Sequence, residues 1–305
     1  MKDAIVLENA NEISVIQAEP IKPTEKKRRR KLPVSEVVKL VISYIVLILV
    51  ALVVILPVVY IVLMAFNEER SLYIDTVFPT QYSFGAFIRL FEQTNYAIWY
   101  GNTIIVGAMT AVGSVLLVLP TAYALSRLNF KGRKHYLMVF LVLQMFPGTM
   151  AMVAYYVLLN MLGLLDSYFG LVIIFSCTAV PGSTFMMKGY FDTIPKSLEE
   201  AAILDGATRF QCVVKIIMPL ARPMIGLICL FGFSAPFGDY MLSKILITDP
   251  SKYTLALGTY QSIYSQSTTD YAMFAAASIL SALPMAIIYM LLQKVIINGL
   301  GGAIK

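Results

Sequence analysis

The amino-acid sequence predicts an all-α, polytopic membrane protein with six transmembrane helices and a helix-turn-helix at the cytoplasmic membrane surface. Three observations support this prediction. First, 58% of the 305 residues are hydrophobic and 14% are charged, which is more apolar surface than one soluble core can bury. Second, six long segments contain no Asp, Glu, Lys, Arg or His. Third, one connection between these segments is patterned as two short helices.

Residues 1–36 are polar, contain three prolines and lack apolar periodicity, so they are predicted to be a mobile cytoplasmic extension. Six consecutive basic residues, 26–31, precede the first apolar segment and supply much of the net charge of +6. A basic run at this place favours contact with an anionic lipid surface over nucleic acid binding. The apolar stretch that follows is too long for the core of a cleavable signal peptide.

Residues 37–298 are predicted to form the membrane domain. A helix crosses a hydrocarbon layer of roughly 30 Å with about 20 apolar residues, and the candidate spans are 40–67, 93–126, 136–165, 167–187, 223–238 and 271–293. The fifth span reaches only about 24 Å at a rise of about 1.5 Å per residue. Either Arg222 therefore snorkels outward, or Asp239 lies at the outer membrane boundary.

Basic loop residues orient the spans, since Lys and Arg are enriched in cytoplasmic loops. The connections after the second and fourth spans carry most of the loop cations: Arg127, Lys131, Arg133, Lys134, Lys188, Lys196, Arg209, Lys215 and Arg222. Both connections are predicted to be cytoplasmic, and with six spans both termini lie on that side. Every span also contains a proline that favours a kink or break, namely Pro57, Pro120, Pro147, Pro181, Pro236 and Pro284.

The sequence offers no catalytic or metal site. Its three cysteines, Cys177, Cys212 and Cys229, indicate neither a disulfide framework nor a zinc cluster, and His135 is the single histidine. A Gly-rich phosphate loop with its Lys-Ser/Thr pair is absent from the sequence. We therefore expect no metal and no cofactor on this chain, and no enzymatic activity of its own.

Residues 194–220 are predicted to form a helix-turn-helix. Ser197 and Glu200 have the spacing of a capping box and predict a helix start. Gly206 can end that helix in a left-handed conformation, and Thr208 can cap a second helix. Phe210, Val213, Val214 and Ile217 are expected on one side of the second helix, with Pro219 and Pro223 marking its passage into the membrane.

The spacing within this segment resembles a known motif. Glu200, Ala201 and Ala202 are followed by Gly206, then by Ile216 and by Met218 with Pro219. This pattern is similar to the coupling motif of the membrane subunits of bacterial ATP-binding-cassette (ABC) importers, in which Leu usually precedes the proline. The resemblance covers nearly all the chain after residue 36. It is greatest to the carbohydrate branch, in particular to the smaller permease subunit of maltose and maltodextrin importers.

The resemblance implies a type I ABC importer permease fold and a location in the bacterial cell membrane. It also implies the partners, which are a second and different permease subunit, two ATPase subunits that bind ATP and Mg, and an extracellular sugar-binding protein. Glu200, Ala201, Ala202 and Gly206 become the contacts that couple the pore to the ATPase. The cytoplasmic tail, 299–305, reaches towards the ATPase dimer interface, although it lacks the family's frequent final glycine.

The connection from residue 247 to 270 is polar and contains Tyr253, Tyr260 and Tyr264. In the resembling family this loop contacts the binding protein, and the alternative is a solvated loop. Phe237, Asp239 and Tyr240 are candidates for the sugar path, because aromatic faces stack on sugar rings and a carboxylate accepts hydroxyl protons. A boundary carboxylate or an interhelix hydrogen bond also explains Asp239.

Three other functions remain open. The cargo of the importer could be another sugar, a polyol or a glycerol phosphate derivative. An ion-coupled secondary transporter or channel would need buried ionisable residues across the bilayer, which the six spans lack. A membrane scaffold would use the helix-turn-helix as an ordinary interaction surface.

Overall fold

A computed structural model describes residues 34–68, 79, 81–264 and 269–301. Within these ranges the regular elements are helices, apart from one isolated β-bridge between Asn67 and Tyr82. The predicted all-α class is thereby confirmed. Of the predicted mobile extension, 1–36, residues 1–33 lie outside the described residues, and a helix begins at Val34. Of the predicted tail, 299–305, the part up to Gly301 is helical and the rest lies outside the described residues.

Four helices of the described part are long and apolar enough to cross a membrane. These are α1 (Val34–Ala65), α3 (Tyr96–Arg127), α6 (Tyr168–Thr193) and α13 (Tyr271–Gly301). Two sharply bent pairs raise the number to six if each pair is one span. One pair is α4 (Arg133–Met145) with α5 (Gly148–Met161), and the other joins Arg209–Leu220 to α10 (Arg222–Gly238).

Proline 147 divides the segment that the sequence predicted as one span. Phe146 has an extended backbone, as the residue before proline favours, and α5 starts after Pro147 at an angle of 101° to α4. The segment 136–165, which was predicted to be one helix, therefore consists of two helices joined by a sharp bend. At the other five prolines for which a kink or break was predicted, the helix continues through the proline: Pro57, Pro120, Pro181, Pro236 and Pro284.

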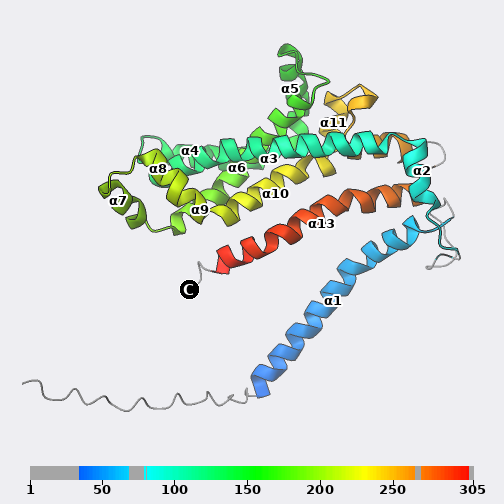
Figure 1. Cartoon of the computed structure of the whole chain (residues 1–305), viewed down its shortest axis with the longest axis horizontal. Coiled ribbons are helices and arrows are strands. Elements are labelled where there is room, and N and C mark those ends of the chain that lie inside the picture. Colours follow the sequence, from blue (N-terminus) through cyan, green and yellow to red (C-terminus); the bar gives the residue numbers. More distant parts are fainter. Residues whose placement is uncertain (1–33, 69–78, 80, 265–268, 302–305) are drawn as a thin grey trace, which may run out of the picture. The chain divides into compact units, whose positions relative to one another are not determined.

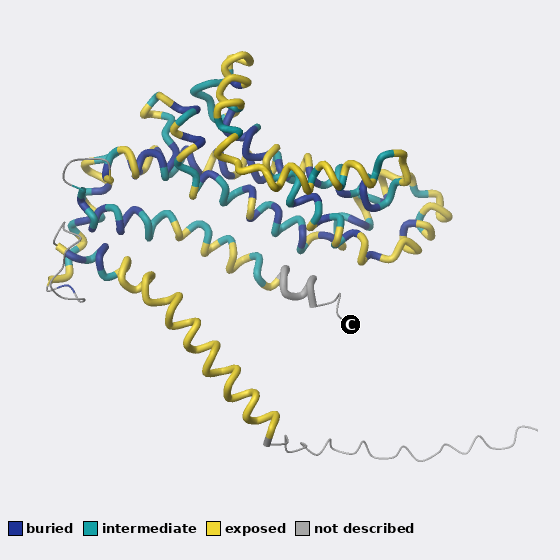
Figure 2. Tube along the Cα trace, turned by 180° about the vertical axis from the view of Figure 1, so that it is seen from behind, coloured by how far each residue is buried: buried dark blue, intermediate teal, exposed yellow. Residues whose placement is uncertain are grey.

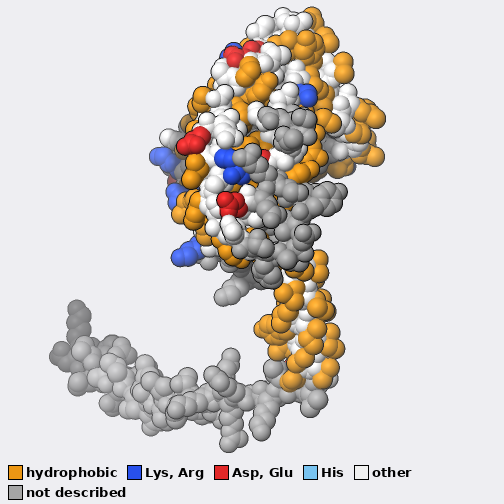
Figure 3. All heavy atoms as spheres, turned by 90° about the vertical axis from the view of Figure 1, so that its right-hand side faces the viewer, with side chains coloured by type: hydrophobic (Ala, Val, Ile, Leu, Met, Phe, Trp, Pro, Cys, Tyr) orange, Lys and Arg blue, Asp and Glu red, His pale blue; other side chains and the backbone are white. Residues whose placement is uncertain are grey.

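Helix α1 belongs to two units of the chain. Residues up to Val54 form one unit and residues from Ile55 on form the other. From residue 35 to 62 most of its side chains are exposed and apolar, and its own hydrophobic side chains cover the face that Figure 3 shows. A helix that is apolar on every side requires apolar surroundings, which a lipid bilayer supplies.

In the larger unit, α3 is the central helix. It packs against α6 and α10, and α10 packs in turn against α13 (Figure 1). Small residues allow a close approach: a Cβ added to Gly107 would lie 2.7 Å from the carbonyl oxygen of Phe233, and one added to Gly232 would lie 2.9 Å from the Cα of Ala111. Membrane helices commonly pack through such small residues. Buried residues follow these contacts along the bundle (Figure 2).

Shorter elements cover the end of the bundle at which α3 begins. Helix α2 (Gly85–Gln93) is held to the start of α13 by an ion pair, 3.0 Å long, between Arg89 and Asp270, the residue before α13. The remaining elements come after α10 and are α11 (Met241–Leu246), η2 (Pro250–Lys252), α12 (Leu255–Thr259) and η3 (Tyr260–Tyr264).

The described part of the connection from 247 to 270 is partly buried and is not the wholly solvated loop that the sequence left open as an alternative. Leu255, Leu257 and Gly258 of α12 are buried, and a Cβ added to Gly258 would clash with the ring of Trp99. Thr103 accepts a hydrogen bond from the backbone N–H of Leu255 at 2.7 Å. The side-chain amide of Asn102 donates to two carbonyl groups of the same connection. This segment therefore packs on α3.

Asp166 fastens the turn before α6 to the segment after α11. Its carboxylate accepts hydrogen bonds from the backbone N–H groups of Thr248 and Asp249, both at 3.0 Å, and Lys252 lies 3.5 Å away. Asp166 has a positive φ of 56°, a conformation that Asp and Asn tolerate. These donors, the N–H of Asp249 first, hold the pKa of Asp166 below its ordinary value.

We expect Asp166→Asn to lower stability at pH 7 by less than about 1 kcal/mol, because solvent screens this partly exposed carboxylate. A depressed pKa contributes stability above the unfolded-state value of about 3.9, and this contribution is lost as the pH falls through the folded-state pKa. The difference between wild type and variant should therefore shrink in acid. Thermal unfolding in detergent between pH 7 and pH 3 measures it, with the exposed Glu92→Gln as the control. A difference independent of pH would contradict the assignment.

Candidate functional site

Residues 194–220 form a hairpin at the end of the bundle where α3 finishes (Figure 1). We refer to them below as the hairpin. It contains α7 (Ser197–Leu204), α8 (Arg209–Cys212), the π-helix η1 (Val213–Ile217) and α9 (Met218–Leu220). The predicted helix-turn-helix is present, with a 79° bend where the hairpin meets α10. Its role in coupling stays a prediction.

The turn of the hairpin is closed by its own backbone. Gly206 has the predicted left-handed conformation, with φ +89°. The N–H of Gly206 donates to the carbonyl of Ile203 at 3.0 Å, and the N–H of Ala207 donates to the carbonyl of Ala202 at 2.9 Å. These two bonds are those of a Schellman motif, which satisfies the last carbonyls of a helix.

The two helix starts differ from each other. Thr208 caps α8, as the sequence predicted, and it forms a complete capping box with Gln211. The predicted capping box of Ser197 and Glu200 is wrong, because Ser197 is already the first residue of α7. The N-cap residue of this helix is Lys196, whose side chain makes no capping hydrogen bond. Lys196 is already helical, so the backbone carbonyls of Pro195 and Lys196 accept the first N–H groups instead.

The second helix does not present the single apolar side that the sequence predicted. Ile217 is buried and Val213 is half-buried, whereas Phe210 and Val214 are exposed. Phe210 lies before η1, at the tip of the hairpin, and from Val213 on the π-helical turn holds more residues than an α-turn, which rotates the side chains that follow.

The predicted coupling residues lie at the accessible tip of the hairpin. Glu200, Ala201 and Gly206 are exposed and Ala202 is half-buried. Two highly exposed apolar side chains lie beside them, Leu204 at 88% and Phe210 at 75%, and neither was predicted to be a contact residue. Large apolar side chains on both sides of a turn glycine were the available signal. A tip with this composition suits a protein partner.

A second candidate site is a cavity of about 240 Å³ near the opposite end of α10. It brings together two predicted path residues, Phe237 and Tyr240, with Tyr260 of the predicted binding-protein contacts. The rings form a continuous series, with centroid distances of 4.3 Å from Tyr240 to Tyr260, 4.9 Å from Tyr260 to Tyr264 and 5.7 Å from Tyr264 to Phe274. Thr259, Ser278 and Ser281 add hydroxyl groups to the lining.

Lys244 extends the polar side of this cluster. Its ammonium group donates to the Tyr240 hydroxyl at 2.7 Å and lies 5.3 Å from the centre of that ring. The hydrogen bond to Tyr240 raises the pKa of Lys244, so the lysine is charged at neutral pH. The cluster therefore offers ring faces, hydroxyl groups and one cation.

The other predicted path and loop residues lie elsewhere. The carboxylate of Asp239 accepts the backbone N–H of Ser243 at 2.8 Å and the Ser243 hydroxyl at 3.0 Å, so it caps α11. The position of Asp239 at the membrane boundary stays a prediction beside this local role. Tyr253 is half-buried and packs between two apolar clusters of the bundle.

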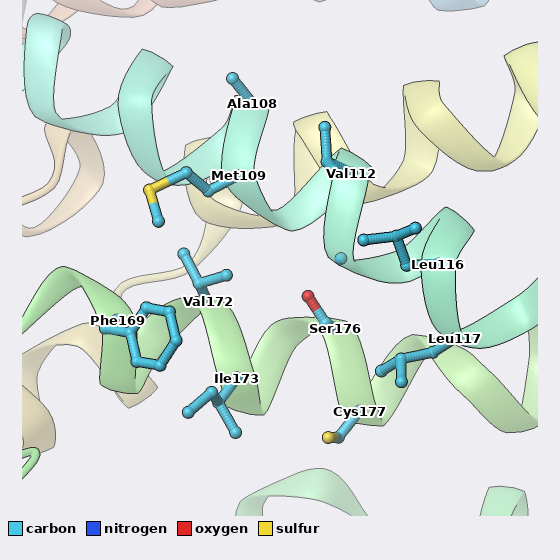
Figure 4. A pocket seen from close by; sticks show the side chains of 11 residues that line it. Ala108, Met109, Val112, Leu116, Leu117, Phe169, Val172, Ile173, Ser176 and Cys177 are labelled. Atoms are coloured by element: carbon cyan, nitrogen blue, oxygen red, sulfur yellow. The ribbon is translucent and has the colours of Figure 1, made fainter.

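A hollow of about 670 Å³ lies between α3 and α6 and is almost entirely apolar (Figure 4). Its lining includes Val112 and Leu116 from α3 and Val172 and Ile173 from α6, and Ser176 contributes a hydroxyl. Such a lining suits lipid or another apolar helix better than a polar cargo. Among the described residues, no group of three His, Cys, Asp or Glu side chains could hold a metal ion.

Solved structures with the same arrangement of helices define the class. The chain is similar to a subunit of a bacterial ABC transporter that imports the acidic polysaccharide alginate, with a TM-score of 0.73 and 25% identity over 87% of this chain and 98% of that one. A second structure, the alginate transporter with a pentasaccharide-bound periplasmic protein, matches with a TM-score of 0.62 and 18% identity over 83% and 92%. The fold is that of an ABC importer permease.

The family follows from the sequence comparisons. Residues 114–301 match the model of the binding-protein-dependent transport system inner membrane component. The maltodextrin permease MdxG of Bacillus subtilis is 39% identical over 77% of this chain and 85% of its own length. The galactooligosaccharide permease GanQ of the same organism is 38% identical over 77% and 84%. The chain belongs to this family of inner membrane components. It is therefore a multi-pass membrane permease subunit and not an enzyme.

We expect Gly206→Ala to destabilise the turn by about 1–2 kcal/mol, because an L side chain is strained at this positive φ. No neighbouring atom lies within 4 Å of an added Cβ, so the effect isolates the backbone. Hydrogen exchange of the Ala207 amide, measured on the full chain in lipid nanodiscs, should accelerate. Gly189→Ala in α6, which also meets no atom within 4 Å, is the matched control and should leave it unchanged. Equal exchange in both variants would contradict the Schellman assignment.

Proposed function

We propose that this permease subunit forms half of the translocation pore of an ATP-driven sugar importer and that its cargo is maltodextrin. The cargo is supported by similarity to permeases of maltodextrin transport systems, 39% identical in Bacillus subtilis and 38% identical in Streptococcus pneumoniae. Coupling to ATP is supported by the hairpin, which combines a backbone-fixed turn with an exposed apolar tip.

The hairpin docks on an ATPase subunit in this proposal. Glu200, Ala201, Ala202 and Gly206 make the contact, and Leu204 adds apolar surface. ATP and Mg bind to two such partner subunits, because this chain lacks a phosphate-binding loop. ATP-driven closure of the two ATPases moves the hairpins together, and the bent helices open the pore outward.

The remaining partners are a second, different permease subunit and an extracellular sugar-binding protein. The latter is supported by the alginate transporter structure that includes a periplasmic binding protein. Both termini and the hairpin lie in the cytoplasm, which accords with the basic residues around the hairpin and after α3. The binding protein meets the opposite end of the bundle, where Tyr260 and Tyr264 are exposed.

The aromatic cavity lies on the sugar path. Its volume of about 240 Å³ is below the roughly 300–1,000 Å³ of typical ligand sites, so in this conformation it admits part of a sugar chain. Stacking on Tyr260 and hydrogen bonds to neighbouring hydroxyl groups are the interactions that a glucose unit would make there.

Galactooligosaccharide is the second candidate cargo, because GanQ is almost as similar as MdxG. We expect the reconstituted complex, with its operon-encoded partners, to show ATPase activity that maltodextrin stimulates more than galactooligosaccharide. Both sugars are added at equal concentration with the cognate binding protein. Stimulation by galactooligosaccharide alone would replace the proposed cargo, and stimulation by neither would reject both.

We expect Tyr260→Ala to raise the maltodextrin concentration for half-maximal uptake by about twofold to twelvefold. The reason is the loss of one stacking interaction of about 0.5–1.5 kcal/mol. Uptake of labelled maltodextrin into proteoliposomes measures it. Tyr156→Ala removes an exposed aromatic ring of α5 outside the cavity and serves as the control. An equal response of the two variants would remove Tyr260 from the path.

A further inference from the structure

The last turn of α3 is a polar junction that joins three elements. The Arg127 guanidinium forms an ion pair with Glu199 of α7 and donates to the carbonyl of Ile194 at 2.8 Å. The Tyr123 hydroxyl donates to the second oxygen of Glu199 at 3.1 Å. Ser126 donates to Asp192 at the end of α6, at 2.6 Å.

The ion pair at this junction is buried. The side chains of Arg127 and Glu199 are only 5% and 11% exposed. Removing one member of a buried pair leaves an uncompensated charge, so such pairs resist separation. Glu199 is buried against α3, whereas the next residue in the chain, Glu200, is exposed at the tip of the hairpin. One face of α7 is thus fixed to α3, and the other is free for a partner.

The connection from the hairpin to α10 has a different character. The helix is interrupted at Ala221, between α9 and α10, with a bend of 79°. Within the described residues, no ion pair joins the hairpin to α10 across this bend. The hairpin is therefore fastened to α3 by charge, and to α10 by a bent backbone and by apolar packing of Ile217 with Met224 and Ile228.

We propose that Arg127, Glu199 and Tyr123 are positioning residues that make α3, α6 and α7 move as one rigid body, with the change of angle taken up at Ala221. Displacement of the hairpin by its partner is then delivered first to α3, the central helix of the bundle. This inference rests on the proposed function and adds to it the route by which motion enters the bundle.

The test uses the complete transport complex with spin labels at Ser197→Cys in α7 and Leu117→Cys in α3, on a background without the three native cysteines. Both sites are exposed. We expect one narrow distance distribution that is the same in the nucleotide-free and vanadate-trapped states. Glu199→Gln should broaden or shift it and lower the sugar taken up per ATP hydrolysed by about tenfold. The charge swap Arg127→Glu with Glu199→Arg should restore both, and the exposed Lys134→Gln should change neither.

A wild-type distance that differs between the two states would overturn the proposal, as would a Glu199→Gln complex with wild-type distance and uptake ratio. If Glu199→Gln fails to assemble, the charge swap decides by the same two readouts. If the swap also fails, Tyr123→Phe decides, since it removes one hydroxyl and should cause a smaller loss of the uptake ratio. Failure of the proposed function looks different, because the wild-type chain would then bind no ATPase at all.

Discussion

The close approach of α3 to α6 and α10 is the constraint on which the rest of the structure depends. Lipid is as apolar as the side chains themselves, so membrane helices gain little from hiding hydrophobic surface and rely on van der Waals contact. Glycines permit that contact here: an added Cβ at Gly113 would lie 2.5 Å from the Ser176 hydroxyl, and one at Gly107 or Gly232 would lie 2.7 Å or 2.9 Å from its nearest neighbour. Because three helices meet along α3, a shift of this helix cannot leave its neighbours unchanged.

The two candidate sites lie at opposite ends of these packed helices. The hairpin adjoins the end of α3, where Val118, Phe191 and Ile217 share an apolar cluster, and the aromatic cavity adjoins the end of α10. Neither site contains a catalytic constellation. What joins them is a set of rigid helices, broken at Pro147 and at Ala221. Such a body is suited to converting a push at one end into a change of shape at the other, which is the physical task of an importer.

The membrane character, the hairpin and its turn glycine were predictable because each depends on local sequence: uncharged length, helix capping and the conformational freedom of Gly206. The Arg127–Glu199 pair was not, since its members are 72 residues apart and look like ordinary loop charges. The packing of α12 against Trp99 was also missed, because a polar segment can bury a few apolar residues without any visible periodicity. The predicted apolar side of the second hairpin helix was wrong where η1 replaced an α-turn. The residue types from Val213 to Ile217 give no warning of a π-helix.

The Schellman turn has a consequence for how quickly a partner can bind and leave. Its two hydrogen bonds lie within the hairpin, so the tip has its shape before any partner arrives. Docking on such a preorganised tip costs little conformational entropy. The encounter rate is then limited by diffusion and orientation rather than by folding of the loop. Assembly of the complex should consequently resemble the joining of two finished surfaces, with the lifetime of the contact set mainly by the apolar side chains at the tip.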